Sequence, residues 1–189
     1  MASPPYIVGI GGTTRPGSSG ERLVRCVLLE AELLGAQSRL FDGKELSALP
    51  HYAPESPSRS PEQLDLIEAL RRADGVVIGT PAYHGGVSGL VKNALDLVED
   101  MREDNYSYFS GRAVGTVVTA AGWQACGGTL QALRGIVHAL RGWPTPIGIS
   151  VNTVAQKLFN EQGKLIEAAV QTACKSQAEQ ILSMARGRQ

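Results

Sequence analysis

The sequence has little of what marks three large classes of protein. Its three cysteines, Cys26, Cys126 and Cys174, are widely separated and form no C-x-x-C motif, which argues against a disulfide framework and against a zinc site. Its 18 basic and 18 acidic side chains cancel, so no basic excess indicates a nucleic-acid partner. No apolar run approaches the roughly 18 residues of a membrane-spanning helix. We therefore expect no metal, no nucleic acid and no membrane among its partners.

What is present fits one α/β domain over residues 1–189. The 189 residues are 43% hydrophobic and 19% charged, which is ordinary for a globular protein with a full core. Residues 1–5 carry no charged segment ahead of an apolar run, so no signal peptide is expected. We expect a cytoplasmic protein with reduced thiols.

Short apolar segments alternate with amphipathic ones five times, which favours a parallel sheet with helices on both faces. Residues 42–60 hold three prolines and few periodic apolar positions, which indicates a long loop such as a lid or binding loop. Ligands of such sheets bind beyond the carboxyl ends of the strands, so the turns after the first, third and fourth strands are candidate sites. The expected strands are 6–11, 36–41, 75–80, 113–119 and 146–151, and the expected helices are 21–34, 61–73, 88–98, 129–140 and 161–184.

The first turn, residues 12–19, fits neither of two common nucleotide motifs. In the dinucleotide fingerprint G-x-G-x-x-G, Thr14 stands at the third glycine. In the phosphate-binding loop of nucleoside triphosphatases, Ser18 stands where the lysine is needed, which disfavours a kinase. Thr13, Arg15, Ser18 and Ser19 ahead of a helix suit a single phosphate monoester. The alternative is a turn whose hydroxyls only cap the helix.

The second turn, residues 80–86, suits a flat ring. Pro81 fixes the backbone, Tyr83 offers an aromatic face or edge, and the glycines permit close approach. The alternative is that Tyr83 and His84 are ordinary loop residues. Lys92 and Asp96 have i,i+4 spacing, which is also typical of an ion pair on a helix surface or at a subunit interface.

Two motifs resemble those of the NAD(P)H-dependent FMN reductases of the flavodoxin-like superfamily. Residues 12–18, GTTRPGS, resemble the family's G-[ST]-x-R-x-x-S phosphate loop. Residues 80–96, TPAYHGGVSGLVKNALD, resemble its T-P-x-Y-x-x-x-x-x-G-x-L-K-N-x-L-D run. The resemblance covers roughly residues 6–151 and implies a three-layer flavodoxin-like sandwich with strand order 2-1-3-4-5. Gly20 departs from the family, in which many members carry a polar side chain at that position.

The resemblance also implies which residues hold FMN. The third turn, residues 119–128, would lie on the other side of the flavin ring, where Trp123 either stacks near the flavin or the incoming nicotinamide, or covers the core. Gly127 and Gly128 precede the expected helix, whose N-terminus would then face the flavin. The implied residues are Thr13, Arg15, Ser18, Ser19 and Gly20 at the phosphate, Pro81, Ala82, Tyr83 and His84 in the second turn, and Thr119, Ala120, Ala121, Gly122 and Trp123 in the third.

The implied activity is hydride transfer from NADPH or NADH to FMN, with no essential acid or base residue. The acceptor would be free flavin serving a partner monooxygenase or, as the second reading, a quinone or azo compound. Relatives are usually dimers or tetramers, so the resemblance implies a homodimer or homotetramer, and residues 88–98 and 100–110 are plausible interface segments. A flavodoxin-type electron carrier and a non-catalytic flavin-binding module are the alternatives from other classes.

Three further residues fit structural roles better than chemical ones. His138 is expected to pack within a helix, and His51 to be an exposed loop residue that at most covers the edge of the flavin. Cys126 lies in the third turn, where a redox role would need a second thiol nearby, and the sequence shows none.

Overall fold

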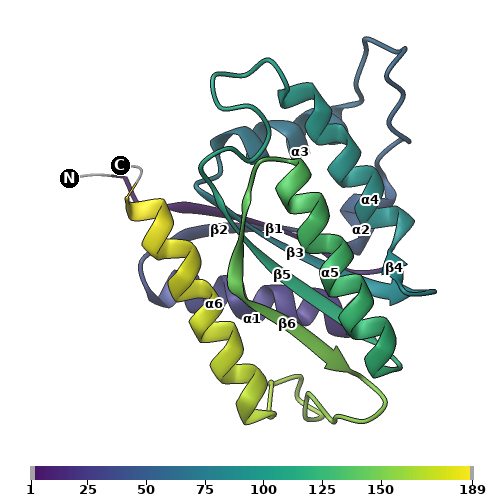
Figure 1. Cartoon of the computed structure of the whole chain (residues 1–189), viewed down its shortest axis with the longest axis vertical. Coiled ribbons are helices and arrows are strands. Elements are labelled where there is room, and N and C mark those ends of the chain that lie inside the picture. Colours follow the sequence, from purple (N-terminus) through teal and green to yellow (C-terminus); the bar gives the residue numbers. More distant parts are fainter. Residues whose placement is uncertain (1–2, 188–189) are drawn as a thin grey trace.

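Five long parallel strands form the centre of the fold, in the spatial order β2-β1-β3-β5-β6 (Figure 1). This order confirms the predicted flavodoxin-like sandwich. The computed structural model describes residues 3–187. The absence of a signal peptide was expected from residues 1–5, of which Met1 and Ala2 lie outside the described residues. The strands are β1 (Tyr6–Gly11), β2 (Gln37–Phe41), β3 (Gly75–Tyr83), β5 (Ala113–Ala120) and β6 (Trp143–Asn152), and a short β4 (Gly86–Val87) pairs antiparallel with the end of β3.

Helices cover both faces of the sheet, as the alternating pattern predicts. One face packs against α1 and α6, and the other against α2 to α5 (Figure 1). Among residues 3–187, no helix is both long and apolar enough to cross a membrane. The helices are α1 (Ser19–Leu33), α2 (Gly43–Ser47), α3 (Pro61–Arg72), α4 (Gly89–Asp96), the 3-10 helix η1 (Leu97–Met101), α5 (Trp123–Ala139) and α6 (Ala168–Arg186).

Side-chain caps start α1, α2, α3 and α4, whereas α5 and α6 begin without one. The Ser18 hydroxyl accepts a hydrogen bond from the backbone N–H of Glu21 at the start of α1. Ser88 caps α4 in the same way. A full capping box joins Ser60 and Gln63 at the start of α3, where Pro61 occupies the first helical position. Such caps fix where each helix begins relative to the strand before it.

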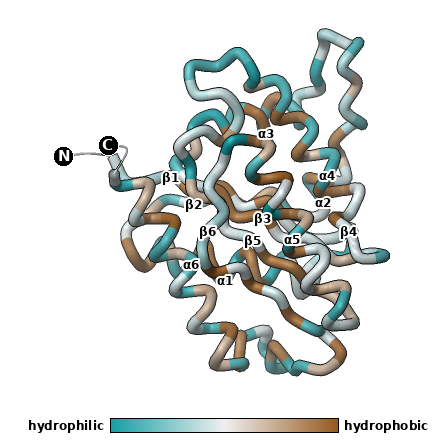
Figure 2. The backbone as a smooth tube through the Cα atoms, viewed as in Figure 1, coloured by the Kyte–Doolittle hydropathy of each residue, from teal (hydrophilic) through white to brown (hydrophobic). Residues whose placement is uncertain are grey.

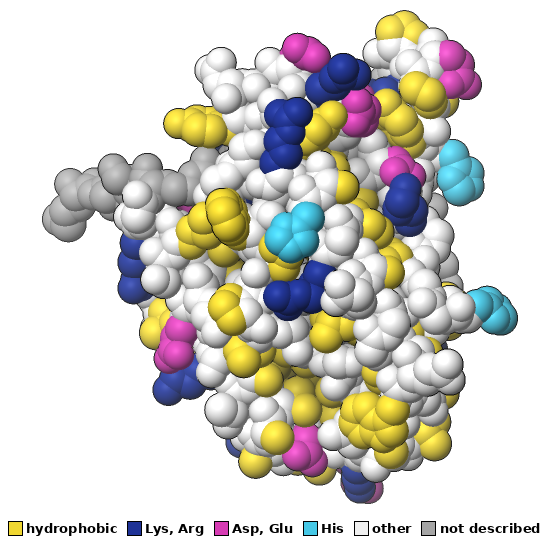
Figure 3. All heavy atoms as spheres, viewed as in Figure 1, with side chains coloured by type: hydrophobic (Ala, Val, Ile, Leu, Met, Phe, Trp, Pro, Cys, Tyr) yellow, Lys and Arg dark blue, Asp and Glu magenta, His cyan; other side chains and the backbone are white. Residues whose placement is uncertain are grey.

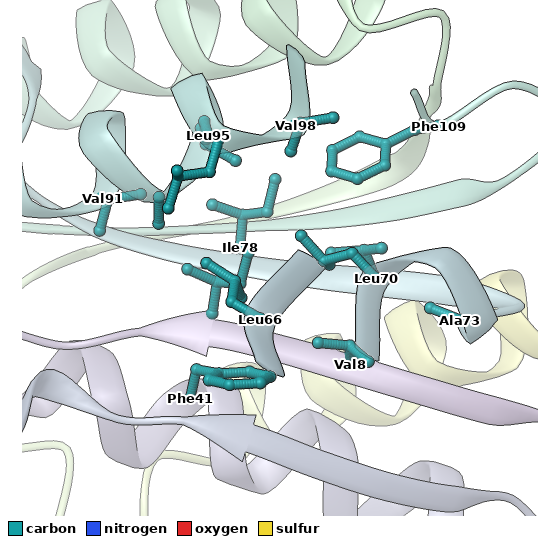
Figure 4. Close-up of a cluster of buried hydrophobic side chains, with 14 of the residues drawn as sticks. Val8, Phe41, Leu66, Leu70, Ala73, Ile78, Val91, Leu95, Val98 and Phe109 are labelled. Atoms are coloured by element: carbon teal, nitrogen blue, oxygen red, sulfur yellow. The ribbon is translucent and has the colours of Figure 1, made fainter. Parts of the chain in front are cut away.

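Two apolar cores lie on opposite sides of the sheet. In Figure 4, strand residues such as Val8 and Ile78 meet Leu66 and Leu70 of α3 and Leu95 of α4. The second core joins α1 and α6 to the other side of the same strands. The tube in Figure 2 shows apolar residues concentrated along the central strands and polar residues on the outer loops. Strands buried on both faces explain the nearly continuous apolar runs in the sequence.

Glycines of β1 and β3 lie beneath helix α1 and leave no room for a side chain there. A Cβ atom on Gly79 would stand 2.4 Å from Cγ2 of Val24, and one on Gly11 would stand 2.8 Å from the same atom. A Cβ on Gly9 would stand 2.7 Å from Cδ1 of Leu28. Real Cβ atoms do not approach so closely, so these glycines set the height of α1 above β1 and β3.

Several element boundaries differ from the sequence prediction. Residues 42–60 are not one loop, because a capping box of Asp42 and Glu45 starts the five-residue α2. Helix α5 begins at Trp123 rather than at 129, so Gly127 and Gly128 lie within it and do not precede it. Tertiary packing of its buried face outweighs the low helix propensity of the two glycines.

The last two elements are also shifted. Strand β6 begins at Trp143, earlier than expected, because an edge strand with a register shift tolerates Pro144 and Pro146. Helix α6 begins only at Ala168, since the preceding residues form a turn closed by the bridge between Phe159 and Leu165. The prediction of a helix from residue 161 was therefore wrong.

Replacing Gly79 with alanine tests the close contact of α1. The added methyl group would press on the fully buried Val24, so the free energy of unfolding should fall by about 1–3 kcal/mol. Denaturant unfolding measures this change. The control is Gly135→Ala in α5, where an added Cβ meets nothing within 4 Å. This substitution should stabilise the protein by roughly 0.5–1 kcal/mol. Equal effects of the two variants would contradict the packing argument.

Candidate functional site

A cavity of about 320 Å³ opens at the carboxyl ends of β1, β3 and β5. This is the edge of the sheet at which parallel α/β proteins bind ligands. Three separate turns supply its walls. It is lined by Gly12, Thr13, Arg15, Ser18, Ser19, Gly20, Pro81, Ala82, Tyr83, His84, Thr119, Ala120, Ala121 and Thr153.

The turn between β1 and α1 forms the polar end of the cavity. The Thr13 hydroxyl accepts a hydrogen bond from the backbone N–H of Arg15 at 3.2 Å, which folds the loop on itself. Gly12 and Gly17 have positive φ angles of 123° and 65°, a backbone region that favours glycine. The loop then enters α1 at Ser18, whose side chain is buried at the cap. Hydroxyl groups and the first N–H groups of the helix therefore converge on one spot.

The charged side chain among the residues that line the cavity is the cation Arg15, while the acidic Glu21 lies in the first turn of α1 close to Gly12. No aspartate or glutamate side chain lines the cavity, whereas Arg15 does. Within residues 3–187, Arg15 has no acidic partner in an ion pair. The N-terminus of α1 adds the positive end of a helix dipole. An anion is the ligand that this arrangement favours.

Pro81, Ala82 and Tyr83 give the other end of the cavity a largely apolar lining. Pro81 and Ala82 lie at the end of β3, where the chain turns back through His84 and Gly85 into β4. The buried Thr80 hydroxyl accepts a hydrogen bond from the backbone N–H of Ser88 at 3.0 Å, which ties this wall to the start of α4. The wall is consequently fixed at both of its ends.

The third wall comes from the end of β5 and from one residue that the sequence analysis missed. Thr153 follows β6 and lines the cavity beside Ala120 and Ala121. Its backbone N–H and its hydroxyl both donate to the carbonyl of Ala120, at 2.8 and 3.2 Å. The sequence did contain a signal for Thr153, because it follows the fifth expected strand, and the turns after neighbouring parallel strands lie at the same edge of the sheet.

Twelve of the predicted site residues line the cavity, and two do not. Gly122 is the N-cap residue of α5, and Trp123 is its first residue. Trp123 is 57% exposed, so the expectation that it covers the core was wrong, while its stacking role stays a prediction. Because α5 starts at Trp123, its N-terminus comes directly after the cavity residue Ala121.

Other singled-out residues have structural surroundings. Lys92 and Asp96 form an exposed i,i+4 ion pair on α4. His51 is exposed, as expected, and His138 is exposed rather than packed. Acidic and basic side chains are scattered over the face seen in Figure 3, without a large patch of one sign.

The cysteines show no sign of reactivity. Cys126 is buried, and its Sγ–H donates to the carbonyl of Val151. Burial raises the pKa of the Cys26 thiol, and it raises the pKa of Cys174 to about 12. Thiols in this state remain protonated near neutral pH and are poor nucleophiles.

The sequence profile of the NADPH-dependent FMN reductase family matches residues 5–156, which is most of the chain. The chain belongs to this family. Its matched segment contains every residue that lines the cavity. The groups that line the cavity also fit the flavin mononucleotide of the family's name. The hydroxyls, Arg15 and the start of α1 suit a phosphate monoester, and the apolar wall suits a flat ring.

Two curated proteins are similar in sequence to parts of this chain. An iron-sulfur flavoprotein of Archaeoglobus fulgidus is 36% identical over 94 residues, which are 50% of this chain and 46% of the relative. An FMN-dependent NADPH-azoreductase of Staphylococcus aureus is 34% identical over 121 residues, which are 63% of this chain and 60% of the relative. The matched segments thus span about half of the lengths of these relatives.

A solved structure extends the likeness to the whole fold. FerB, a flavoenzyme NAD(P)H:(acceptor) oxidoreductase from Paracoccus denitrificans, superposes with a TM-score of 0.74. The superposition covers 96% of this chain and 99% of FerB, at 17% sequence identity. At this identity the likeness establishes the shared flavodoxin-like fold.

Residues 42–60, predicted as a lid or binding loop, contribute nothing to the walls of the cavity, and residues 50–60 are the part that remains a loop. The side chain of Asn93 in α4 accepts a hydrogen bond from the N–H of Tyr52 at 2.8 Å and donates to the carbonyl of Pro50 at 3.1 Å. The guanidinium of Arg59 binds both carboxylate oxygens of Asp100, at 2.8 and 2.9 Å. The loop is therefore fastened to α4 and to η1 beside it.

Replacing Asn93 with alanine tests this attachment. Without the two hydrogen bonds, backbone amides of residues 50–58 should exchange with solvent roughly 10-fold faster. This factor corresponds to a fall of about 1.4 kcal/mol in the free energy of local opening. Hydrogen–deuterium exchange read by mass spectrometry measures the rate. Lys92→Ala, which removes only an exposed ion pair, is the matched control. Unchanged exchange in the Asn93 variant would mean that other contacts hold the loop.

Proposed function

We propose that this protein is an NAD(P)H-dependent FMN reductase that binds FMN in the cavity between the three turns. The observation that carries the proposal is the pairing, within one cavity, of a phosphate-type donor set with a largely apolar wall. Membership in the FMN reductase family supports it. Residues 1–189 act as one domain in this proposal.

Each wall has its own task. Thr13, Arg15, Ser18 and Ser19 bind the phosphate, and Gly20 lies beside Thr119, where an added Cβ would stand at an ordinary contact distance of 3.5 Å from the Thr119 hydroxyl. Ser19, which lines the cavity, supplies the polar contact that Gly20 lacks. The remaining residues of the proposed site hold the ring: Pro81, Ala82, Tyr83, His84, Ala120, Ala121 and Gly122, with Trp123 at the rim.

When bound, FMN supplies the redox chemistry, by accepting a hydride from NADPH or NADH and passing electrons on. The chain contributes position and charge rather than an acid or base. Pro81 and the turn through His84 orient the ring, while Arg15 neutralises the phosphate. The start of α5 lies after Ala121 and has no acidic residue in its first turn, so its dipole favours negative charge near that rim.

The proposed acceptor class rests on membership in the FMN reductase family. Free flavin for a partner monooxygenase is the first candidate, and a quinone or azo compound the second. The named activity of the Staphylococcus aureus relative favours the azo compound within that second class. We also propose a homodimer or homotetramer in the cytoplasm. Tyr83 and Trp123, 59% and 57% exposed beside the cavity, are candidates for burial by a second subunit.

Steady-state turnover tests the proposal directly. Consumption of NADPH and of NADH is followed by absorbance in air, with and without added FMN, and then with a quinone and an azo dye as acceptors. We expect consumption that saturates with FMN, and the two nucleotides compared give the donor preference. FMN binding seen as a shifted visible spectrum, without turnover on any acceptor, would instead favour an electron carrier or a non-catalytic flavin-binding module.

Replacing Arg15 with alanine tests the phosphate end. Loss of one charge-assisted contact should weaken FMN binding by about 2 kcal/mol. Quenching of flavin fluorescence gives the dissociation constant. Arg102→Ala removes an equal charge from an exposed residue outside the cavity and should leave the affinity unchanged. An unaltered affinity in the Arg15 variant would refute the phosphate assignment.

A further inference from the structure

A glycine outside the two family motifs touches the backbone of the phosphate loop. Gly43 is the first residue of α2, and it lies directly against Thr13. A Cβ atom on Gly43 would stand 1.7 Å from the Thr13 carbonyl oxygen and 2.6 Å from the Thr13 carbonyl carbon. Both of these atoms belong to the backbone, so no rotation of a side chain could relieve the overlap.

The position of Gly43 is itself firmly held. The Asp42 carboxylate accepts hydrogen bonds from the N–H groups of Lys44 and Glu45 at 2.9 and 3.0 Å. Glu45 accepts in return from the N–H of Asp42 at 3.1 Å. Arg39 binds Glu45 at 3.3 Å and also Asp65 of α3, which joins α2 to its neighbours. Gly43 therefore cannot move aside without breaking this network.

The opposite side of the loop is closed by α1. A Cβ on Gly12 would stand 3.2 Å from the backbone nitrogen of Gly43 and 3.4 Å from Cβ of Glu21, and Gly12 has a φ of 123°. Glu21 is a buried residue in the first turn of α1. The segment from Gly12 to Thr13 thus passes through a slot whose two walls are α1 and α2.

We propose that Gly43 is a positioning residue that sets the place of Thr13 and, through it, the phosphate end of the cavity. This inference rests on the proposed function, because it assumes that the loop holds the FMN phosphate. The absence of a side chain at residue 43 lets the loop lie against α2. Any added carbon displaces Thr13, and with it the hydrogen bond from the Arg15 N–H to the Thr13 hydroxyl.

The test compares FMN with riboflavin, which has the same ring but no phosphate. Dissociation constants for both are measured by flavin fluorescence quenching on the wild type and on Gly43→Ala. We expect the preference for FMN over riboflavin to fall by roughly 10-fold or more, the scale of one lost charge-assisted hydrogen bond. Riboflavin affinity should stay nearly constant, since the ring walls do not touch Gly43. A variant that merely weakened the fold would lower both affinities together.

Two further variants make the outcome decisive. Asp42→Ala removes the cap of α2 without adding an atom at Gly43, and it should lower the FMN preference in the same direction but by less. Gly135→Ala adds a methyl group in open space and should leave the preference unchanged. If Gly43→Ala does not fold, the Asp42 variant decides, and an unchanged preference there overturns the inference.

The same data separate the two levels of the argument. If the wild type binds FMN and riboflavin equally well, the phosphate site of the proposed function fails, and this inference fails with it. If the wild type prefers FMN and the Gly43 variant keeps that full preference, only the positioning role of Gly43 is refuted.

Discussion

The contact between α1 and the glycines of β1 and β3 is the constraint on which the cavity depends. Gly11 and Gly79 leave no side chain between the strands and Val24, so the helix lies close to the sheet. Its first turn is thereby brought level with the ends of β3 and β5, where Pro81 and Thr119 stand. A higher α1 would lift the polar loop away from the apolar wall. The two halves of the cavity would then no longer face one ligand.

Much of the fold and most of the candidate site could be predicted from the sequence. The parallel sheet follows from the alternating elements, because apolar runs buried on both faces leave a clear signal, and its strand order follows from the family resemblance. The turns after the strands could be identified as candidate sites because the carboxyl ends of parallel strands meet at one edge of the sheet. The place of Arg15 and Pro81 in those turns made them candidates, and the family resemblance assigned them to the site.

What could not be predicted depends on contacts between distant segments. The helix at residues 43–47 is too short to show a period, and its capping box is visible only as Asp42 and Glu45 three residues apart. Gly127 and Gly128 looked like a helix boundary, yet the buried face of α5 carries the helix through them. The attachment of residues 50–60 depends on Asn93, a side chain far along the chain whose role no local pattern reveals.

The place of Asn93 has a consequence for how the family motif is understood. The run from Thr80 to Asp96 has its first part at the cavity, in Pro81 to His84, whereas Asn93 fastens a loop and the pair of Lys92 and Asp96 lies on a helix surface. One continuous stretch of sequence thus contains both residues that line the cavity and residues that only support the fold. A related chain could keep the second part for its architecture after losing the first. A chain can therefore resemble the family over the whole stretch without being able to hold a flavin. Only the first part, Pro81 to His84, indicates flavin binding.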